Sequence, residues 1–399
     1  MMINNQLTAD EKQAFDQEIT RSRTLLYSYT FENAPLAFIY GDSVVKAEMS
    51  DLEKRNVDLT EDIYMDCYNY HCVAQLGYSF FYVNNAFQIP LSEYLRGLEH
   101  PRPATFAEHR SAGFRTYEEY RKLYDAWVEK DGRRLMDKLR QGKPTKETVE
   151  WRILMGAPDR TQQLVNIMPY GNQLIAEGIV TWSENGIIKD VAFAVALLFD
   201  DDCTVRQDRS WNDLIQWPTI GVEYRNRMFD EGRPQQGQTK GQLEAYLNRN
   251  KSIMQDRKLN SLEKRNKELT EGKWVDAFNS LKTDIFHRDR YRRQWPCQHI
   301  SFKLATAQKV DSIVKKMAPD RKMWPVHTYA YGNQVAAECI ISWTEKGIYK
   351  ETPFISFLLF DKDGLVIRDR SHITLDHFPG AVEIAGELDV PSYLTQVKS

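Results

Sequence analysis

"YGNQLIAEGIVTWSENG" (Tyr170–Gly186) recurs in this chain as "YGNQVAAECIISWTEKG" (Tyr331–Gly347). Extended without a gap, the stretches Tyr170–Trp211 and Tyr331–His372 are identical at 22 of 42 positions. Identity at this level over a constant spacing marks an internal duplication. The sequence therefore predicts two copies of one structural unit.

Each copy has the pattern of β-strands. Three segments rich in β-branched and aromatic residues are separated by short turns that contain Asp, Asn or Gly, which is typical of an antiparallel meander. The segments are Leu174–Trp182, Val191–Phe199 and Thr204–Trp211 in the first copy, and Val335–Trp343, Thr352–Phe360 and Leu365–His372 in the second. The middle segment is almost continuously apolar, which predicts a strand covered on both faces.

Helical patterns precede the repeated strands. Charged and apolar residues follow helical spacing over Ser261–Phe286 and Thr306–Met317 before the second copy, and over Thr116–Leu139 before the first. The polar, Gly- and Gln-rich stretch Asp230–Gln242 is typical of a linker. A long charged helix is predicted to follow it from about Leu243.

A second echo, "DLEKRN" (Asp51–Asn56) against "SLEKRN" (Ser261–Asn266), sets the predicted boundaries. We expect an N-terminal helical arm (1–50), a first domain with an insertion (51–228), a linker and helix (229–260), a second domain (261–385) and a C-terminal tail (386–399). In the alternative, residues 1–110 form a separate helical arm and the first domain begins near Thr116.

Composition excludes several classes of protein. Apolar content of 42% and charged content of 27% are those of a globular chain, and a net charge of -3 gives no basic surface for nucleic acid. The basic stretch "HRDRYRRQW" (His287–Trp295) is interpreted as an exposed helix end with solvated arginines. No apolar run is long enough for a membrane span, so the cytoplasm is expected. The five cysteines form no CxxC pair, so neither a disulfide framework nor a zinc site is expected.

The repeated strands resemble those of the nuclear transport factor 2-like superfamily, which includes ketosteroid isomerase-like and SnoaL-like domains. The residues that carry the resemblance are "YGNQVAAECIISWTEKG" and "FLLFDKDGLVIRDRSH", with their counterparts in the first copy. The resemblance implies the α+β class, with two cystatin-like, cone-shaped domains, each a curved antiparallel sheet packed by helices around an apolar cavity. Members of the superfamily often pair through their outer sheet faces, so the two domains are expected to form an internal pseudo-dimer.

The resemblance also implies a function. We expect a cofactor-independent acid–base enzyme of the isomerase, dehydratase or cyclase type, acting on a small apolar metabolite in the cavity of the second domain. One alternative is a non-catalytic small-molecule binding or assembly module, and another is an epoxide hydrolase-like enzyme. The expected partners are the small substrate and a second copy bound through the outer sheet faces, with no nucleic acid and no membrane.

Candidate catalytic residues come from comparing the two copies. His327 stands where the first copy has Asn166, His372 where it has Trp211, and Asp376 where it has Ile215. Imidazole and carboxyl groups exchange protons near neutral pH, whereas the first-copy side chains do not. The second domain is therefore predicted to be the catalytic one.

Asp369 is the fourth catalytic candidate. It recurs in the duplicated "DRS" motif, and its place in the last strand is similar to that of the water-activating aspartate of epoxide hydrolases. The alternative is that this motif forms a surface ion pair or serves an interface. Strand alternation puts Asp369 and Ser371 on one face and Arg370 and His372 on the other, so at most one of these pairs lines the cavity.

Substrate-binding candidates lie on the neighbouring strands. Glu338 and Trp343 match Glu177 and Trp182 of the first copy. Glu338 is equally compatible with a position on the cavity wall and a position on its rim. For Trp343, a place in the hydrophobic core is favoured over a role in binding the substrate. The full set of substrate-binding candidates is Asn166, Tyr329, Tyr331, Glu338 and Trp343.

No metal or cofactor site is expected. His327, His372, Asp376 and His377 could together suit iron or zinc, but the chain has no HxH, HxxxH or HExxH spacing. GxGxxG, Walker and GxSxG motifs are absent from the sequence as well.

Overall fold

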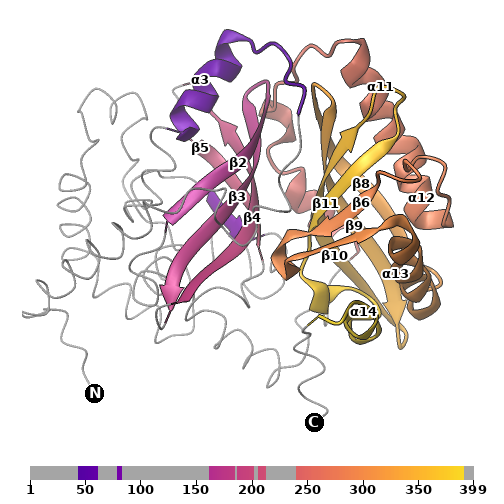
Figure 1. The fold of residues 1–399 in the computed structure, drawn as a ribbon. Coiled ribbons are helices and arrows are strands. Elements are labelled where there is room, and N and C mark those ends of the chain that lie inside the picture. The colour runs from indigo at the N-terminus through magenta and orange to yellow at the C-terminus, as the bar shows by residue number, and fades with distance from the viewer. Residues whose placement is uncertain are drawn as a thin grey trace, which may run out of the picture.

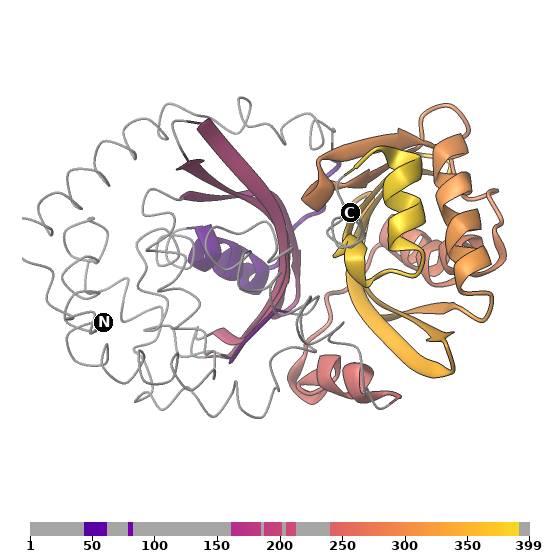
Figure 2. The same ribbon diagram turned by 90° about the horizontal axis from the view of Figure 1, so that it is seen from below.

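The computed structural model describes residues 44–61, 79–82, 161–184, 187–201, 205–212 and 240–390. Two curved sheets lie side by side in these ranges, and helices cover the side of each sheet that faces away from the other (Figures 1 and 2). The chain therefore belongs to the α+β class. Most of the predicted N-terminal arm, the insertion, the segment Thr116–Leu139, most of the linker and the end of the tail lie outside the described residues, and the domain boundaries stay predictions.

The first sheet has the strand order β1-β5-β4-β3-β2. Strands β2 to β5 form an antiparallel meander, and β1 runs parallel to β5. The strands are β1 (Ser79–Tyr82), β2 (Thr161–Tyr170), β3 (Gln173–Glu184), β4 (Ile187–Phe199) and β5 (Val205–Asn212).

The second sheet repeats this order and adds one strand, giving β7-β6-β11-β10-β9-β8. Its meander runs from β8 to β11, and β6 runs parallel to β11 as β1 does to β5. The strands are β6 (Arg292–Trp295), β7 (Ile300–Lys303), β8 (Lys322–Tyr331), β9 (Gln334–Glu345), β10 (Ile348–Phe360) and β11 (Val366–His372). The predicted meander is confirmed in both copies.

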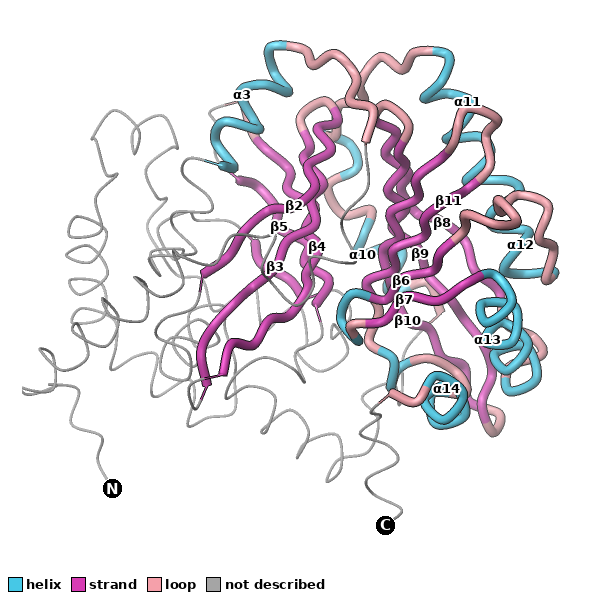
Figure 3. Tube along the Cα trace, viewed as in Figure 1, coloured by secondary structure: helices cyan, strands magenta, loops and turns pink. Residues whose placement is uncertain are grey.

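The described helices are α3 (Asp51–Leu59), α10 (Gln242–Leu247), α11 (Ser261–Leu269), α12 (Val275–Ser280), α13 (Leu304–Met317) and α14 (Ala381–Leu388), with short turns η6 (Lys251–Ile253), η7 (Thr270–Trp274), η8 (Pro296–Gln298) and η9 (Leu375–His377) (Figure 3). The helical patterns predicted over Ser261–Phe286 and Thr306–Met317 are found as α11 to α12, which end at Ser280, and as α13. The prediction of a long helix from Leu243 is wrong, because α10 ends after six residues with Asn248 as its C-cap, and asparagine is a weak helix former. None of the described helices is long and apolar enough to cross a membrane.

The "LEKRN" echo encodes a helix start. At α11 the Asn260 side chain accepts a hydrogen bond from the Glu263 amide, and the Glu263 carboxylate accepts one from the Asn260 amide. Ser50 and Glu53 form the same reciprocal capping box at α3. The other carboxylate oxygen of each glutamate accepts the amide of Gly332 or Gly171, respectively, at 3.0 Å, so each cap also anchors its helix to a strand turn.

The repeated "YGN" encodes the turns that these caps hold. Gly171 and Gly332 have φ values of +61° and +60°, in the left-handed region that favours glycine. A Cβ on Gly332 would lie 1.8 Å from the carbonyl oxygen of Val45, and one on Gly171 would lie 1.7 Å from that of Gln255. Val45 leads into α3 and Gln255 leads into α11, so each copy sends an extended segment across the turn of the other.

Two apolar cores flank the second sheet. Along β10, Phe354 and Leu358 belong to the core on the helix side, whereas Ile355 and Phe357 belong to a core shared with the first sheet. Alternate residues of a strand point to opposite faces, and both faces of β10 are covered. The prediction of a doubly covered middle strand is therefore confirmed for this copy.

Candidate active site

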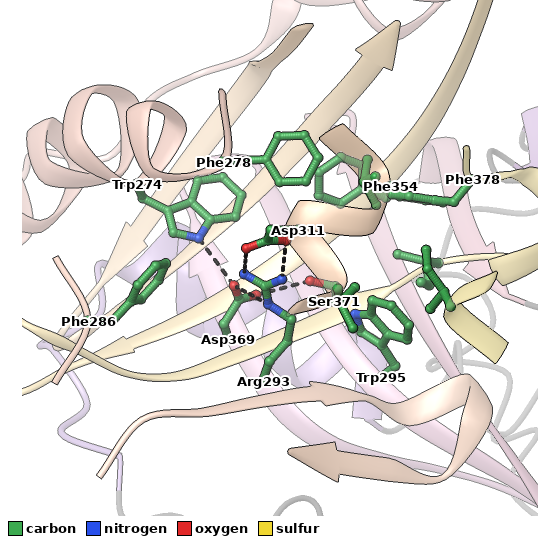
Figure 4. Close-up of a pocket in the computed structure, with 14 residues that line it drawn as sticks. Trp274, Phe278, Phe286, Arg293, Trp295, Asp311, Phe354, Asp369, Ser371 and Phe378 are labelled. Carbon is green, nitrogen blue, oxygen red and sulfur yellow. Dashed lines mark hydrogen bonds and ion pairs between the residues drawn. The ribbon is translucent and has the colours of Figure 1, made fainter. Parts of the chain in front are cut away.

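A cavity of about 40 Å³ lies on the helix side of the second sheet (Figure 4). Six of the 14 residues that line it are aromatic: Trp274, Phe278, Phe286, Trp295, Phe354 and Phe378. Three charged side chains, Arg293, Asp311 and Asp369, also line it. The cavity is thus an apolar space with a compact group of charges on one wall.

Asp369 reaches the cavity because of its place in β11. Asp369 and Ser371 line the cavity, whereas the alternate residues Arg370 and His372 face the first sheet, as their ion pairs show. The prediction that only one of these pairs lines the cavity is confirmed. Parallel pairing of β11 with β6 places Arg293 directly opposite Asp369.

Arg293 joins Asp369 to a second carboxylate, that of Asp311 on α13. The guanidinium nitrogens Nη1 and Nη2 lie 2.6 and 3.1 Å from the two Asp311 oxygens, and Nε lies 3.7 Å from Asp369 Oδ2. The two aspartates and the arginine are each at least nine-tenths buried. Two carboxylates therefore share one guanidinium inside the cavity wall.

Three further donors fix the orientation of the Asp369 carboxylate. Trp274 Nε1 and the Tyr291 hydroxyl each donate to Oδ2 at 3.3 Å. Ser371 donates to Oδ1 at 3.0 Å and is itself 2.7 Å from Ser356 Oγ. A carboxylate that accepts three hydrogen bonds from buried side chains is held in one position.

The protonation states of the donors follow from burial and charge. Burial raises the pKa of Tyr291 well above its ordinary value, and the nearby aspartates raise it further, so Tyr291 stays protonated and donates. Burial alone would lower the pKa of Arg293, but Asp311, Tyr291 and Asp369 together outweigh burial and raise it. Arg293 therefore stays cationic.

The first copy lacks this arrangement at the equivalent register position. Asp208 matches Asp369 and accepts a hydrogen bond from Ser210 at 2.7 Å, as Asp369 does from Ser371. The residue of β1 that stands opposite Asp208 is Phe80, where β6 has Arg293 opposite Asp369. Among the described residues, the arginine opposite the aspartate of the "DRS" motif is thus present at this register position in the second copy and absent there from the first.

Both predicted catalytic histidines, His327 and His372, lie between the sheets. His372 Nε2 is 3.1 Å from Glu177 Oε1 of the first sheet. His327 Nε2 is 3.2 Å from the Leu247 carbonyl oxygen and 3.8 Å from Glu338 Oε2, and burial lowers the pKa of His327 against the opposing charge of Glu338. Neither ring lines the cavity.

The other predicted residues are also away from the cavity. Asn166 donates to Glu177 at 2.9 Å, Tyr329 and Glu338 both accept from Arg209, and Tyr331 donates to the Ala47 carbonyl oxygen. Trp343 lies in the helix-side core, and Asp376 is buried in η9. The structure brings Asp369 to the cavity and most of the remaining candidates to the surface between the sheets.

Arg293 and Asp311 were missed by reasoning from the sequence. The interpretation of "HRDRYRRQW" as an exposed helix end is wrong, because its second half forms the buried strand β6. A signal was present in α13, where Asp311 shares the spacing of Ala307, Val310 and Val314, the buried face of the helix. A charge at an apolar position of a helix indicates a buried partner.

A metal centre finds no support in the described ranges. No group of three or more His, Cys, Asp or Glu side chains there could hold a metal ion. The four residues considered from the sequence, His327, His372, Asp376 and His377, do not form such a group.

Comparison with known proteins gives matches among solved structures. No family model and no curated protein matches the chain. The AclR protein of Streptomyces galilaeus matches at 19% identity and a TM-score of 0.26, over 34% of this chain and 95% of that chain. A SnoaL-like protein from a Jannaschia species matches at 14% identity and a TM-score of 0.24, over 35% and 100% of the two chains.

A protein with a ketosteroid isomerase-like fold from Catenulispora acidiphila also matches, at 13% identity and a TM-score of 0.23, over 30% of this chain and 90% of that chain. Nuclear transport factor 2-like proteins are among the other matches. SnoaL-like, ketosteroid isomerase-like and nuclear transport factor 2-like proteins, the kinds that the repeated strands resemble, are thus among the matches.

Proposed function

We propose that this chain is a cofactor-independent acid–base enzyme of the isomerase, dehydratase or cyclase type, and that its substrate is a small, largely apolar molecule held in the cavity of the second copy. The observation that carries the proposal is the Asp369 carboxylate, which is 2% exposed and faces an aromatic-lined cavity. A general base held in this way contributes about 10²–10⁴ in rate.

The side chains around Asp369 suit a proton transfer. Asp369 would take a proton from the substrate, while Trp274, Tyr291 and Ser371 hold its carboxylate in place. Once protonated, Asp369 would return the proton to another atom of the substrate, and Asp311 would hold Arg293 in place beside it. The aromatic walls would keep bulk water away from the reacting atoms.

We also infer that the chain is a tandem of two cystatin-like, cone-shaped domains arranged as an internal pseudo-dimer. The inference is supported by the shared strand order and by reciprocal ion pairs between the sheets, Arg209 with Glu338 and Arg370 with Glu177. In this arrangement the first copy supports the second. The proposal leaves homo-oligomer formation and a cytoplasmic location as predictions.

Epoxide hydrolysis is a second candidate function, favoured by the pairing of two carboxylates. One of Asp369 and Asp311, as a carboxylate, would deprotonate a water molecule as it attacks the epoxide carbon, and the other, carried as the carboxylic acid, would protonate the epoxide oxygen as its C–O bond breaks. A non-catalytic binding or assembly module is favoured by a different observation, the small volume of about 40 Å³ left between the aromatic rings.

Isotope-labelled water separates these functions. The full chain is incubated with a metabolite extract in deuterium oxide or in oxygen-labelled water, and the products are read by mass spectrometry. A product of unchanged composition that has gained deuterium marks an isomerase or a cyclase, loss of water marks a dehydratase, and uptake of labelled oxygen marks a hydrolase.

The matched aspartates of the two copies provide the control. Asp369→Asn should abolish the change in the labelled compound, and Asp208→Asn should not. Full activity of Asp369→Asn, or an extract in which the unchanged chain alters no compound, would contradict the proposal, and the second result would favour the binding module.

A further inference from the structure

We propose that the ligand of this cavity is a small organic cation, an alkylammonium group whose charge lies against the aromatic rings and beside Asp369. This inference deepens the proposed function by naming the substrate class, and it rests on that function only in placing the substrate in this cavity.

The charges on the cavity wall are unequal. Two carboxylates, Asp311 and Asp369, line the cavity together with one guanidinium, that of Arg293. A second guanidinium, that of Arg321, acts on the charge of Asp311 from outside the cavity lining, where it stacks on the Phe278 ring at 4.9 Å. Among the described residues Asp369 has one ion pair, with Arg293 Nε at 3.7 Å, while the Nη atoms of Arg293 pair with Asp311. Because a buried charge with little counter-charge is costly, a cationic ligand would lower the cost of burying Asp369 where it meets the cavity.

An anionic ligand would meet two carboxylates on this wall. The guanidinium that lines it, that of Arg293, is already held by the Tyr291 hydroxyl at 3.1 Å and by both oxygens of Asp311. A fully neutral ligand would add no charge opposite Asp369, which lies 3.7 Å from Arg293 Nε. A cation is therefore favoured over both.

Asp369 also keeps room for a donor from the ligand. A carboxylate oxygen can accept two hydrogen bonds, and among the described residues Oδ1 accepts one, from Ser371. The N–H of a protonated amine could donate to the remaining position. A quaternary ammonium group would interact with the same oxygen through charge alone.

The aromatic walls supply the second half of the recognition. The faces of aromatic rings attract cations, Trp most strongly, and the attraction grows when water is excluded. Two tryptophans and four phenylalanines line this cavity. Methyl groups on the nitrogen would pack against these rings, so such a ligand is largely apolar on its outside and charged at its centre.

The cavity volume limits the ligand to a few non-hydrogen atoms. A space of about 40 Å³ is a few times the roughly 10–15 Å³ that one water needs on the same measure. Tetramethylammonium is a suitable probe, and tert-butanol is a neutral molecule of similar size.

Isothermal titration of the full chain with each probe at constant ionic strength tests the inference. Tetramethylammonium should bind saturably and about tenfold or more tighter than tert-butanol, as expected for two or more rings and a carboxylate. Asp369→Asn should remove this preference, and Asp208→Asn should keep it. Equal binding of the two probes, or a preference unchanged in Asp369→Asn, would overturn the inference.

A wall variant covers the case in which Asp369→Asn does not fold. Phe378→Leu keeps an apolar side chain but removes one ring, so it should weaken tetramethylammonium by ~3- to 10-fold and leave tert-butanol nearly unchanged. An equal loss for both probes would overturn the inference. Cation binding without turnover would reject the proposed enzymatic function but not the proposed ligand class. Turnover without cation binding would reject the proposed ligand class but not the enzymatic function.

Discussion

Arg370 of β11 and Glu177 of β3 form a two-point ion pair between the sheets, with Nε 3.0 Å from Oε1 and Nη2 2.9 Å from Oε2. Glu177 is fully buried and is also 3.1 Å from His372. Arg370 and His372 flank Ser371 and point away from the cavity that Asp369 faces. The strand that presents Asp369 is thus held from behind by a residue of the first copy.

Glu177→Gln should strongly destabilise the chain. The change leaves the Arg370 guanidinium buried without a counter-charge, and breaking a buried pair on one side costs about 3–5 kcal/mol. Urea denaturation measures the loss in the free energy of unfolding. Lys54→Met is the control, because Lys54 pairs with Asp51 on the surface and an exposed pair contributes about 1 kcal/mol or less. Equal losses in the two variants would show that the buried pair has no special weight.

We also expect the protein to lose stability in acid because of the Glu177 carboxylate. Burial alone would raise the pKa of Glu177, but the charge of Arg370 and the hydrogen bond with His372 outweigh it and lower the pKa from 4.5 to about 2. A depressed pKa contributes stability above the unfolded value, and this stability is lost as the pH falls through the folded value.

The free energy of unfolding should therefore fall as the pH goes from 4.5 to about 2, and this fall should be smaller in Glu177→Gln. Urea titrations at a series of pH values measure both slopes. Identical slopes for the two chains would contradict the assignment of this acid loss to Glu177.

The repeat made the strands predictable because a meander depends on local patterns, namely apolar segments and turn residues. Position along β11 also showed that Asp369 and His372 face opposite sides. It did not show which side meets the other sheet, because both faces of the strand are buried. Comparison of the copies found where they differ, and some of the largest differences, His327 and His372, lie at the surface where the copies touch.

The contacts of Asp369 with Arg293 and, through it, with Asp311 could not be predicted from the sequence, for a different reason. Arg293 comes from a four-residue strand inside a basic segment, and Asp311 comes from a helix. Their contact depends on how that helix packs against the sheet. Local periodicity carries no information on such a pairing, although a charge on the apolar face of α13 indicates that one exists.

The catalytic role predicted for His327 can be tested against that of Asp369. Asp369→Asn should lower turnover by about 10²–10⁴, the contribution of a general base. His327→Asn installs the residue found at the matched position, Asn166. The His327 ring contacts the Leu247 carbonyl oxygen and does not line the cavity. Turnover of this variant should therefore stay close to that of the unchanged chain. A loss as large as that of Asp369→Asn would move the chemistry to the surface between the sheets.

Gly332→Ala should separate the crossing segment from its turn. The alanine would have to adopt a φ of +60° with its Cβ 1.8 Å from the Val45 carbonyl oxygen, so either the turn or the segment must move. Gly347→Ala is the matched control, because that glycine has a φ of +78° but no atom within 4 Å of an added Cβ. The control should lose about 1–2 kcal/mol from backbone strain alone.

Steric conflicts of this kind are among the mechanisms that cost about 4–5 kcal/mol or more in total. After subtraction of the backbone strain seen in the control, the clash itself should add at least about 2 kcal/mol in Gly332→Ala. Urea denaturation of both variants measures the difference. Limited proteolysis offers a second readout, because a displaced segment loses the hydrogen bond between the Val45 amide and Asn333 Oδ1 and should be cleaved between residues 44 and 50 well before the control. Equal stability and equal cleavage of the two variants would mean that the crossing of the copies does not depend on the glycine that both "YGN" turns share.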